Sequence, residues 1–239
     1  MVNYSLLEWD TKAFGYKIAQ LNIKEESMDQ IQDAIRKLKE ENFKLAYCYL
    51  SPEDKTSNDA ILSCSGLLVD EKVAYSLLVD DTSGNNLDEH VEYFTKKNVP
   101  KELRSLTLQS GAYSRFKVDP NFRNDEYVTL YNKWIEKSVS GELADHILVY
   151  KEDDQILGFI TLKIGPVKGT IGLLAVDERS RGKSIGKKLL SSSLSHFIKN
   201  NVNIIEVVTQ KNNQIACMFY EKCGFSLSQV VNVYHIWIK

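Results

Sequence analysis

The sequence has little of what marks several protein classes. Its 239 residues include only four prolines and twelve glycines, too few for a collagen-like or low-complexity chain. The formal net charge of −2 argues against a nucleic-acid partner, which requires a basic surface. No apolar run approaches the roughly 18 residues of a membrane span, and no signal-peptide pattern opens the sequence. These absences predict a globular, cytoplasmic protein that binds neither nucleic acid nor membrane.

Cysteine is also scarce, and its spacing matches no metal site. Cys48, Cys64, Cys217 and Cys223 form no Cys-x-x-Cys pair, and no histidine lies at zinc-ligand spacing. We therefore expect no bound metal. Cys217 and Cys223 fall in and just after a predicted helix, where free thiols usually fill the core. Reduced thiols agree with the cytoplasmic prediction.

Apolar periodicity in the first 110 residues predicts alternating strands and helices. We expect strands at 17–23, 44–50 and 103–108 and an extended segment at 67–79. Helices are expected from Ser27 onward, at about 58–64, and at 87–97 after a polar turn at 80–86. The Gly-, Ser-, Asp- and Pro-containing segment 110–122 predicts a loop, and its length is typical of functional loops.

The second half shows a clearer pattern. A helix at 123–139 carries an apolar and aromatic stripe that we expect to face the core; the stripe consists of Tyr127, Leu130, Tyr131, Trp134 and Ile135. A hairpin at 146–164, a buried strand at 169–176, an amphipathic helix from about 185, a strand at 204–208, a helix at 213–222 and a last strand at 230–238 follow. A weak boundary near 110 would divide the chain into an N-terminal α/β domain, 1–110, and a second domain, 111–239.

The stretch DERSRGKSIGKKLL at 177–190 contains Gly182-Lys183-Ser184, the end of a nucleotide-binding P-loop. A P-loop also needs a glycine five residues before Gly182, where this chain has Asp177. The P-loop interpretation therefore fails. A basic turn between a buried strand and a helix can still bind an anion on the helix N-terminus. A solvated basic turn is the alternative.

Two motifs identify a family resemblance. Residues 181–186, Arg-Gly-Lys-Ser-Ile-Gly, resemble the acetyl-CoA signature of the GNAT superfamily of N-acetyltransferases, with Ser184 in place of the central glycine. Residues 208–225 are similar to that family's second motif, through Asn213, Ala216, Tyr220, Gly224 and Phe225. The resemblance covers about 110–239. It implies an α/β GNAT fold, with a mixed central sheet and flanking helices, preceded by the smaller α/β domain 1–110.

The resemblance implies acetyl-CoA as co-substrate and assigns roles to individual residues. The pyrophosphate is expected on the amides of Arg181, Gly182, Lys183, Ser184, Ile185 and Gly186. Leu174 and Val176 are expected to offer backbone groups on a splayed strand, and Asn213 to bond the pantetheine or to cap its helix. Tyr220 is the expected general acid, because a phenol of pKa about 10 can protonate a departing thiolate.

The sequence does not identify the general base that would deprotonate the amine. The histidines at 90, 146, 196 and 235 have no motif behind them, and neither have Asp119 and Asp145. A water relay is a further alternative.

The acceptor prediction rests on weaker similarity. Residues 111–122 (GAYSRFKVDPNF), together with 7–21, resemble the nucleotide-sugar branch of the family, the dTDP-fucosamine acetyltransferases. This implies a dTDP-linked amino-dideoxyhexose acceptor, used in surface-polysaccharide synthesis and bound by Tyr113, Ser114, Arg115, Phe116 and Asp119. Alternatively, Arg115 pairs with Asp119 and only stiffens the loop. Acetylation of another amine and a non-catalytic binding module are the alternative functions. The sequence allows a homodimer.

Overall fold

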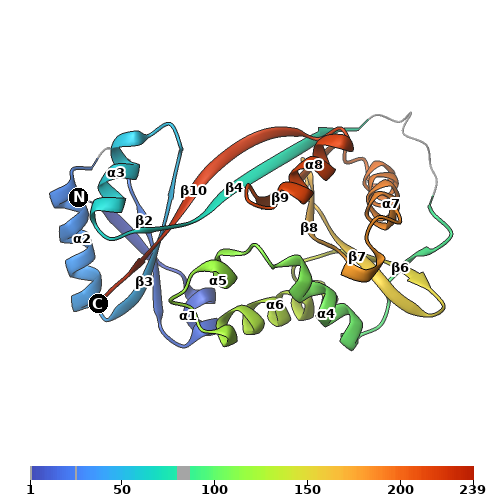
Figure 1. Ribbon diagram of the computed structural model, residues 1–239, viewed down its shortest axis with the longest axis horizontal. Coiled ribbons are helices and arrows are strands. Elements are labelled where there is room, and N and C mark those ends of the chain that lie inside the picture. The colour runs from blue at the N-terminus through green and yellow to red at the C-terminus, as the bar shows by residue number, and fades with distance from the viewer. Residues whose placement is uncertain (1, 25, 80–86) are drawn as a thin grey trace.

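The computed structural model describes residues 2–24, 26–79 and 87–239, which build one mixed sheet of ten strands (Figure 1). Its order is β1-β2-β3-β10-β4-β9-β8-β7-β6-β5. The strands are β1 (Asn3–Leu6), β2 (Lys17–Asn22), β3 (Phe43–Leu50), β4 (Leu67–Leu78), β5 (Val91–Tyr93), β6 (His146–Glu152), β7 (Gln155–Ile164), β8 (Gly169–Val176), β9 (Ile204–Gln210) and β10 (Ser226–Trp237). The helices are α1 (Glu8–Phe14), α2 (Met28–Glu40), α3 (Lys55–Ser63), α4 (Lys101–Ser110), α5 (Arg115–Val118), α6 (Asn124–Val139), α7 (Ile185–Lys199) and α8 (Gln214–Lys222), with a 3₁₀ turn, η1 (Glu178–Ser180). The predicted α/β fold with a mixed, helix-flanked sheet is confirmed.

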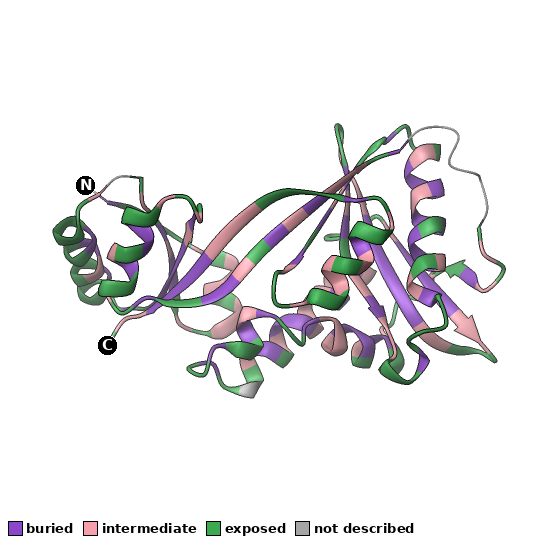
Figure 2. Ribbon diagram, turned by 45° about the horizontal axis from the view of Figure 1, so that its top comes forward, coloured by how far each residue is buried: buried purple, intermediate pink, exposed green. Residues whose placement is uncertain are grey.

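Helices cover both faces of the sheet. On β3, Ala46 and Cys48 pack in the cluster of α2 and α3, whereas Leu45 and Tyr47 pack with α5 and α6. Farther along, α7 and α8 cover one face of the sheet, while α4 and α6 cover the other. In Figure 2 buried residues run along the strands and the inner sides of the helices, the long strands β4 and β10 also carry exposed segments, and the outer helices expose the side that faces away from the sheet. The alternation of side chains along each strand therefore builds two apolar layers.

Most predicted elements are present. Helix α2 begins at a capping box, in which Ser27 accepts from the Gln30 amide and the Gln30 side chain accepts from the Ser27 amide at 2.8 Å. The stripe on α6 faces the core as predicted, with Tyr127, Leu130, Tyr131 and Ile135 buried and Trp134 half-buried.

Two element predictions in the first half are wrong. Residues 103–108 lie in α4, which begins after Pro100 and buries Leu103 and Leu106 one turn apart. The predicted helix at 87–97 contains instead the short strand β5, which pairs with β6. The turn predicted at 80–86 lies outside the described residues. The predicted loop at 110–122 contains the single-turn helix α5.

The sheet crosses the predicted domain boundary without a break. Strand β10 lies between β3 and β4, antiparallel to both, so strands from both halves of the chain alternate within one sheet. Helix α4 ends at Ser110, and Gly111 follows directly. The division into 1–110 and 111–239 stays a prediction.

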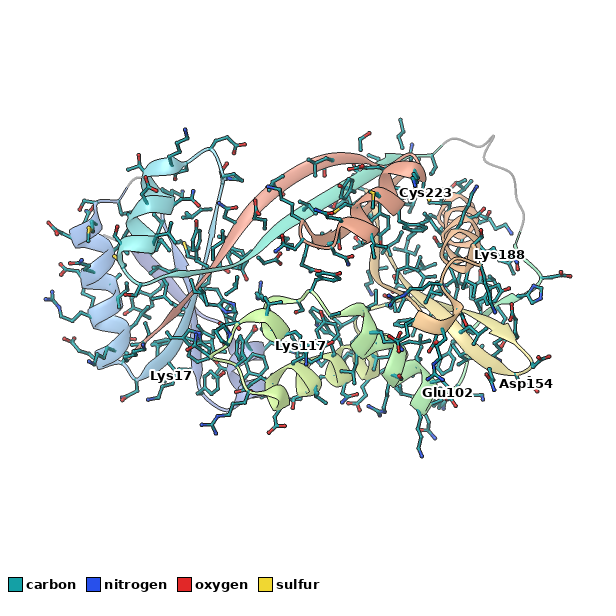
Figure 3. The ribbon with its side chains drawn as sticks, in the orientation of Figure 1. Lys17, Glu102, Lys117, Asp154, Lys188 and Cys223 are labelled. Carbon is teal, nitrogen blue, oxygen red and sulfur yellow. The ribbon has the colours of Figure 1, made fainter. Side chains whose placement is uncertain are left out.

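The cysteines carry free thiols. Burial raises the pKa of Cys48 to about 12, and it also raises the pKa of Cys223, which lies at the end of α8 (Figure 3). Within the described part of the chain, no helix has the length and apolar character needed to cross a membrane.

Candidate active site

The central feature of the site is a gap in the sheet between β8 and β9. These strands pair in parallel only from Gly169 opposite Ile205 to Ile171 opposite Val207. Beyond this point β8 stays paired with β7, and β9 stays paired with β4 as far as Gln210 opposite Lys72. The two strands therefore separate, and each leaves one edge unpaired.

A bulge on β8 directs amide groups into this gap. The Leu173 amide donates to Thr161 Oγ1 at 2.8 Å, and the Asp177 amide donates to the Leu157 carbonyl at 2.8 Å, both toward β7. Alternate residues of a strand point their N–H groups in opposite directions. The amides of Leu174 and Val176 therefore face the unpaired edge, as the predicted contacts to pantetheine and acetyl groups require.

The gap opens into a cavity of about 440 Å³. Its wall contains residues of α6 from one face of the sheet and of α8 from the other, which the separation of β8 and β9 makes possible. The lining residues are Trp9, Asp10, Tyr49, Asp70, Lys72, Ser110, Ser114, Arg115, Phe116, Leu130, Tyr131, Trp134, Gly172, Leu173, Leu174, Val207, Val208, Thr209, Gln210, Asn213, Ala216 and Tyr220.

Tyr220 lies in the wall of the cavity. Its ring is buried against Phe225, with the centroids 5.6 Å apart, and its hydroxyl makes no hydrogen bond to any described residue. Burial raises the pKa of Tyr220, so the phenol stays protonated in neutral solution. Asn213 lines the same cavity and caps α8 by accepting from the Ala216 amide at 3.2 Å.

The basic loop at 181–186 lies next to this site, outside the cavity wall. Its backbone has positive φ at Gly182 (82°) and at Ser184 (60°), which turns the chain into α7. The first helical bond of α7 runs from the Lys188 amide to the Ser184 carbonyl, so the three preceding amides have no acceptor in the helix. A Cβ at Gly186 would lie 3.5 Å from Phe219, an ordinary contact. Free amides and an uncrowded surface fit a pyrophosphate group.

Arg115 is the most unusual charged group of the cavity. Its guanidinium carbon lies 4.6 Å from the ring centroids of both Tyr47 and Phe116, and its Nε is buried without a hydrogen-bond partner. Within the described ranges, Arg115 has no carboxylate at ion-pair distance. The alternative that Arg115 pairs with Asp119 is therefore wrong.

Asp119 is engaged elsewhere. Its carboxylate accepts from His235 Nδ1 at 2.6 Å, Trp237 Nε1 at 2.9 Å and the Asn121 amide at 2.9 Å. These donors outweigh the effect of its burial and hold the pKa of Asp119 at about 2, while burial lowers the pKa of His235 to about 4. Of the five predicted acceptor residues, Ser114, Arg115 and Phe116 line the cavity. Asp119 and the exposed Tyr113 do not.

The other base candidates also lie away from the cavity. Asp145 pairs with Lys163 at 2.7 Å, and the rings of His146 and His196 stack edge-on at 4.3 Å. His90 stacks on Tyr150. In the part of the chain that the structure describes, no three His, Cys, Asp or Glu side chains are placed to hold a metal ion.

The structure adds three charged residues that sequence reasoning missed, Asp10, Asp70 and Lys72. Burial raises the pKa of Asp10 and raises that of Asp70 to about 7, and it lowers the pKa of Lys72. Asp70 and Lys72 lie two apart in a segment predicted as extended, and such residues share a face of the strand. The two charges on one face of the strand were the signal that the sequence offered. Nothing in the sequence showed that this face would pack against residues of the second half of the chain.

Comparison with known proteins agrees with this geometry. Residues 109–225 match the family model described as "Acetyltransferase (GNAT) family". N-alpha-acetyltransferase 30 of Schizosaccharomyces pombe is 27% identical over 100 residues, which cover 40% of this chain and 67% of that protein. Mycothiol acetyltransferase of Sanguibacter keddieii is 28% identical over 94 residues, covering 36% of this chain and only 30% of that protein.

Similarity of fold extends over the whole chain. The crystal structure of a GCN5-related N-acetyltransferase from Sphaerobacter thermophilus matches 100% of this chain and 77% of that one, with a TM-score of 0.66 and 12% sequence identity. At this identity the match shows the fold alone.

Proposed function

We propose that this chain, which belongs to the GNAT family of acetyltransferases through residues 109–225, acetylates the primary amine of a small molecule that also carries an anionic group. The observation that carries the proposal is Arg115, a guanidinium without a carboxylate partner in the wall of the cavity that also contains Tyr220. A partly buried cation without a counterion is costly unless a ligand completes its contacts.

The acetyl donor is acetyl-CoA, which supplies an activated thioester. The free amides at the N-terminus of α7 would hold its pyrophosphate, and the unpaired edge of β8 would hold the pantetheine arm. The Leu174 amide faces the same gap and would stabilise the negative charge that develops on the acetyl oxygen. Amide donors placed in this way are typically worth about 3–4 kcal/mol.

Tyr220 would deliver the proton that the departing sulfur needs. Its hydroxyl is not occupied by another side chain, and its raised pKa keeps it in the protonated form that a general acid requires. Asn213 caps α8 and lines the same cavity, which supports a contact between its side chain and the pantetheine.

The charges of the cavity wall favour a zwitterionic acceptor such as an amino acid. Asp10 and Asp70 balance Lys72 and Arg115, so the wall is close to neutral when all four are ionised. A zwitterion keeps that balance, with its anion at Arg115 and its amine toward the carboxylates. The names of the similar enzymes, N-alpha-acetyltransferase 30 and mycothiol acetyltransferase, mention no nucleotide-linked acceptor.

The dTDP-linked amino-dideoxyhexose predicted from the sequence remains the second candidate, for surface-polysaccharide synthesis. The aromatic side chains of the wall favour it, because Trp9, Tyr49 and Trp134 offer surfaces on which a thymine ring can stack. Its diphosphate would bind Arg115, but it would also approach Asp10 and Asp70.

A panel assay that detects released thiol tests the proposal. The acceptors are amino acids, including diamino acids, dTDP-4-amino and dTDP-3-amino hexoses, free amino sugars, aminoglycosides and short peptides. We expect turnover of an acceptor that carries both an amine and an anionic group. Turnover confined to acceptors without an anionic group would contradict the proposal.

Arg115→Ala sharpens this test. It should raise the KM for the acceptor about 10- to 150-fold, since a lost charged hydrogen bond is typically worth about 1.5–3 kcal/mol. The affinity for acetyl-CoA should not change. Lys117→Ala is the matched control, because the exposed Lys117 (labelled in Figure 3) comes from the same helix and stacks on Tyr127 at 5.2 Å, outside the cavity. Equal effects of the two variants would remove Arg115 from acceptor binding.

A further inference from the structure

We propose that Asp70, on β4 in the first half of the chain, is the general base that deprotonates the acceptor amine. The inference rests on the proposed acetyl transfer. It places one catalytic group outside residues 109–225, the part that matches the family model.

The position of Asp70 follows from the sheet. Pairing between β4 and β9 ends at Lys72 opposite Gln210, and Asp70 lies two residues farther along β4, opposite Val233 of β10. The end of β9 therefore leaves Asp70 uncovered on that side, at the gap. Asp70 lines the cavity together with Leu174 and Tyr220, so the base, the oxyanion donor and the acid surround one space.

The carboxylate of Asp70 has no structural task. It is 8% exposed, and it makes neither a hydrogen bond nor an ion pair within 4 Å to any described residue. Asp10 differs, since the Tyr47 hydroxyl donates to it at 3.5 Å, and Glu71 differs, since it pairs with Lys211 at 2.6 Å. A buried acid without partners is unfavourable for folding, so its retention in the cavity wall suggests a role toward a ligand.

The charged groups around Asp70 set its proton affinity. Burial raises its pKa to about 7, whereas Arg115 from α5 and Lys72 from its own strand oppose this rise and Glu71 adds to it. The other titratable groups of the cavity wall are Asp10 of α1, Tyr49 of β3, Tyr131 of α6 and Tyr220 of α8. A base whose pKa lies near 7 can remove a proton from an ammonium group and release it again to water.

The proton balance of the reaction is complete with these two residues. Asp70 accepts one proton from the acceptor ammonium and later releases it to solvent. The neutral nitrogen then forms a C–N bond with the acetyl carbonyl carbon, and the C–S bond breaks. Tyr220 donates its proton to the sulfur, and the second proton lost from nitrogen restores the phenol. One acetyl group is transferred, and one proton is released.

The test is the pH dependence of kcat/KM between pH 5.5 and 9.5, measured with an acceptor found in the panel. In the native enzyme kcat/KM should rise with pH through a pKa near 7, because Asp70 must be ionised. Asp70→Asn should lower kcat/KM at pH 7 about a hundredfold or more and abolish the rise of kcat/KM with pH. Asp70→Glu should retain this rise. Acetyl-CoA affinity and thermal stability of Asp70→Asn should stay at native values or above.

Glu71→Gln is the matched control, since it removes the same charge from the neighbouring position, outside the cavity. It should keep the rise of kcat/KM with pH and the native maximum, with the apparent pKa moved only slightly lower, because Glu71 adds to the raised pKa of Asp70. An active Asp70→Asn enzyme whose kcat/KM rises with pH as in the native enzyme would overturn the proposal for Asp70. The proposed acetyl transfer would not be affected by that result. If no acceptor is turned over, the proposed function fails instead. Carbon-13 NMR of the aspartate carboxyls then decides separately: titration of Asp70 near pH 7 supports the inference, and an Asp70 already ionised at pH 5 overturns it.

Discussion

Tyr220 shows how a single position combines packing and chemistry. Its ring contributes to the apolar core beneath α8, in contact with Tyr75 and Phe225, while its hydroxyl bonds to none of the residues that the structure describes. A phenylalanine would keep the ring contacts and remove only the hydroxyl. A substitution at this position therefore separates the proposed catalytic role of the hydroxyl from the packing of the ring.

We expect Tyr220→Phe to lower kcat about 10- to 1000-fold, because a positioned general acid is lost. The KM for acetyl-CoA should change less than about twofold. Steady-state kinetics with thiol detection gives both values. Tyr75→Phe is the control, since Tyr75 donates its hydroxyl to Glu221 at 2.8 Å, outside the cavity. A Tyr220→Phe rate within twofold of native would exclude Tyr220 as the acid.

Among single residues, those predicted from a local motif come together in the structure. Tyr220, Asn213 and Leu174 line one cavity, as their motif positions imply. Asp10 and Asp70 could not be predicted in this way, because they belong to no motif. Only the folded chain brings them into the cavity wall beside Arg115. The contacts of Asp119, which does not line the cavity, depend on the fold in the same way, because its partners His235 and Trp237 are more than 110 residues away.

At the scale of the element, the start of α7 combines two requirements. Ser184 is the N-cap and adopts a left-handed backbone conformation, φ 60° and ψ 13°, yet its side chain makes no capping hydrogen bond. Glycine adopts this conformation without strain, whereas other residues pay of order 1 kcal/mol for it. The position is the one where the family signature carries glycine.

Ser184→Gly should therefore raise the free energy of unfolding by up to about 1 kcal/mol, with acetyl-CoA affinity equal to or above the native value. Ser184→Val should act in the opposite direction, because a β-branched side chain is strained at positive φ. Thermal unfolding and calorimetric titration with acetyl-CoA measure the two quantities. A loss of affinity in Ser184→Gly would show that the serine hydroxyl itself contacts the cofactor.

Elements with strong local signals were predicted well, and those fixed by distant contacts were not. Ser27 and the apolar spacing after it predicted α2, and the structure adds a capping box at its first turn. In 103–108 the leucines suggested a strand, but Leu103 and Leu106 are spaced for a helix that packs on α6 and β8, and Pro100 precedes its first turn. Strand β5 has only three residues and is held by its pairing with β6. A sequence pattern within three residues cannot predict a pairing with a strand so far away in the chain.

At the scale of the whole molecule, the buried pair of Asp119 and His235 joins the loop before α6 to β10. His235 also stacks on Tyr47 of β3, with ring centroids 4.7 Å apart. Because Tyr47 in turn contacts Arg115, the part of the cavity wall that contains Arg115 is anchored to strands from both halves of the chain.

This pair predicts a pH dependence of stability. The pKa of His235 is about 4 in the folded protein and 6.5 in its ordinary state, so between these values the unfolded chain binds a proton that the native one does not. Stability should be complete above pH 6.5 and fall as the pH is lowered toward 4, by up to about 1.4 kcal/mol per unit. Asp119, with its pKa lowered from 3.8 to about 2, should add a further loss below pH 4.

Urea unfolding of the native protein and of His235→Asn between pH 7.5 and 4.5 measures this effect. The variant should be less stable at pH 7.5, and its stability should depend less steeply on pH. His196, whose pKa burial also lowers, is present in both proteins, so the difference between them isolates His235. Parallel pH profiles would show that His235 does not carry the dependence.

The place of β10 also has a consequence for synthesis on the ribosome. Residues 226–237 are made after every other strand, yet they belong between β3 and β4. Until they emerge, β3 and β4 each have an edge with unsatisfied backbone groups, and such edges invite pairing with other chains. The nascent protein should therefore be most prone to aggregation after β3 and β4 have emerged and before residues 226–237 follow, and chaperones that shield open strand edges should matter most in that interval.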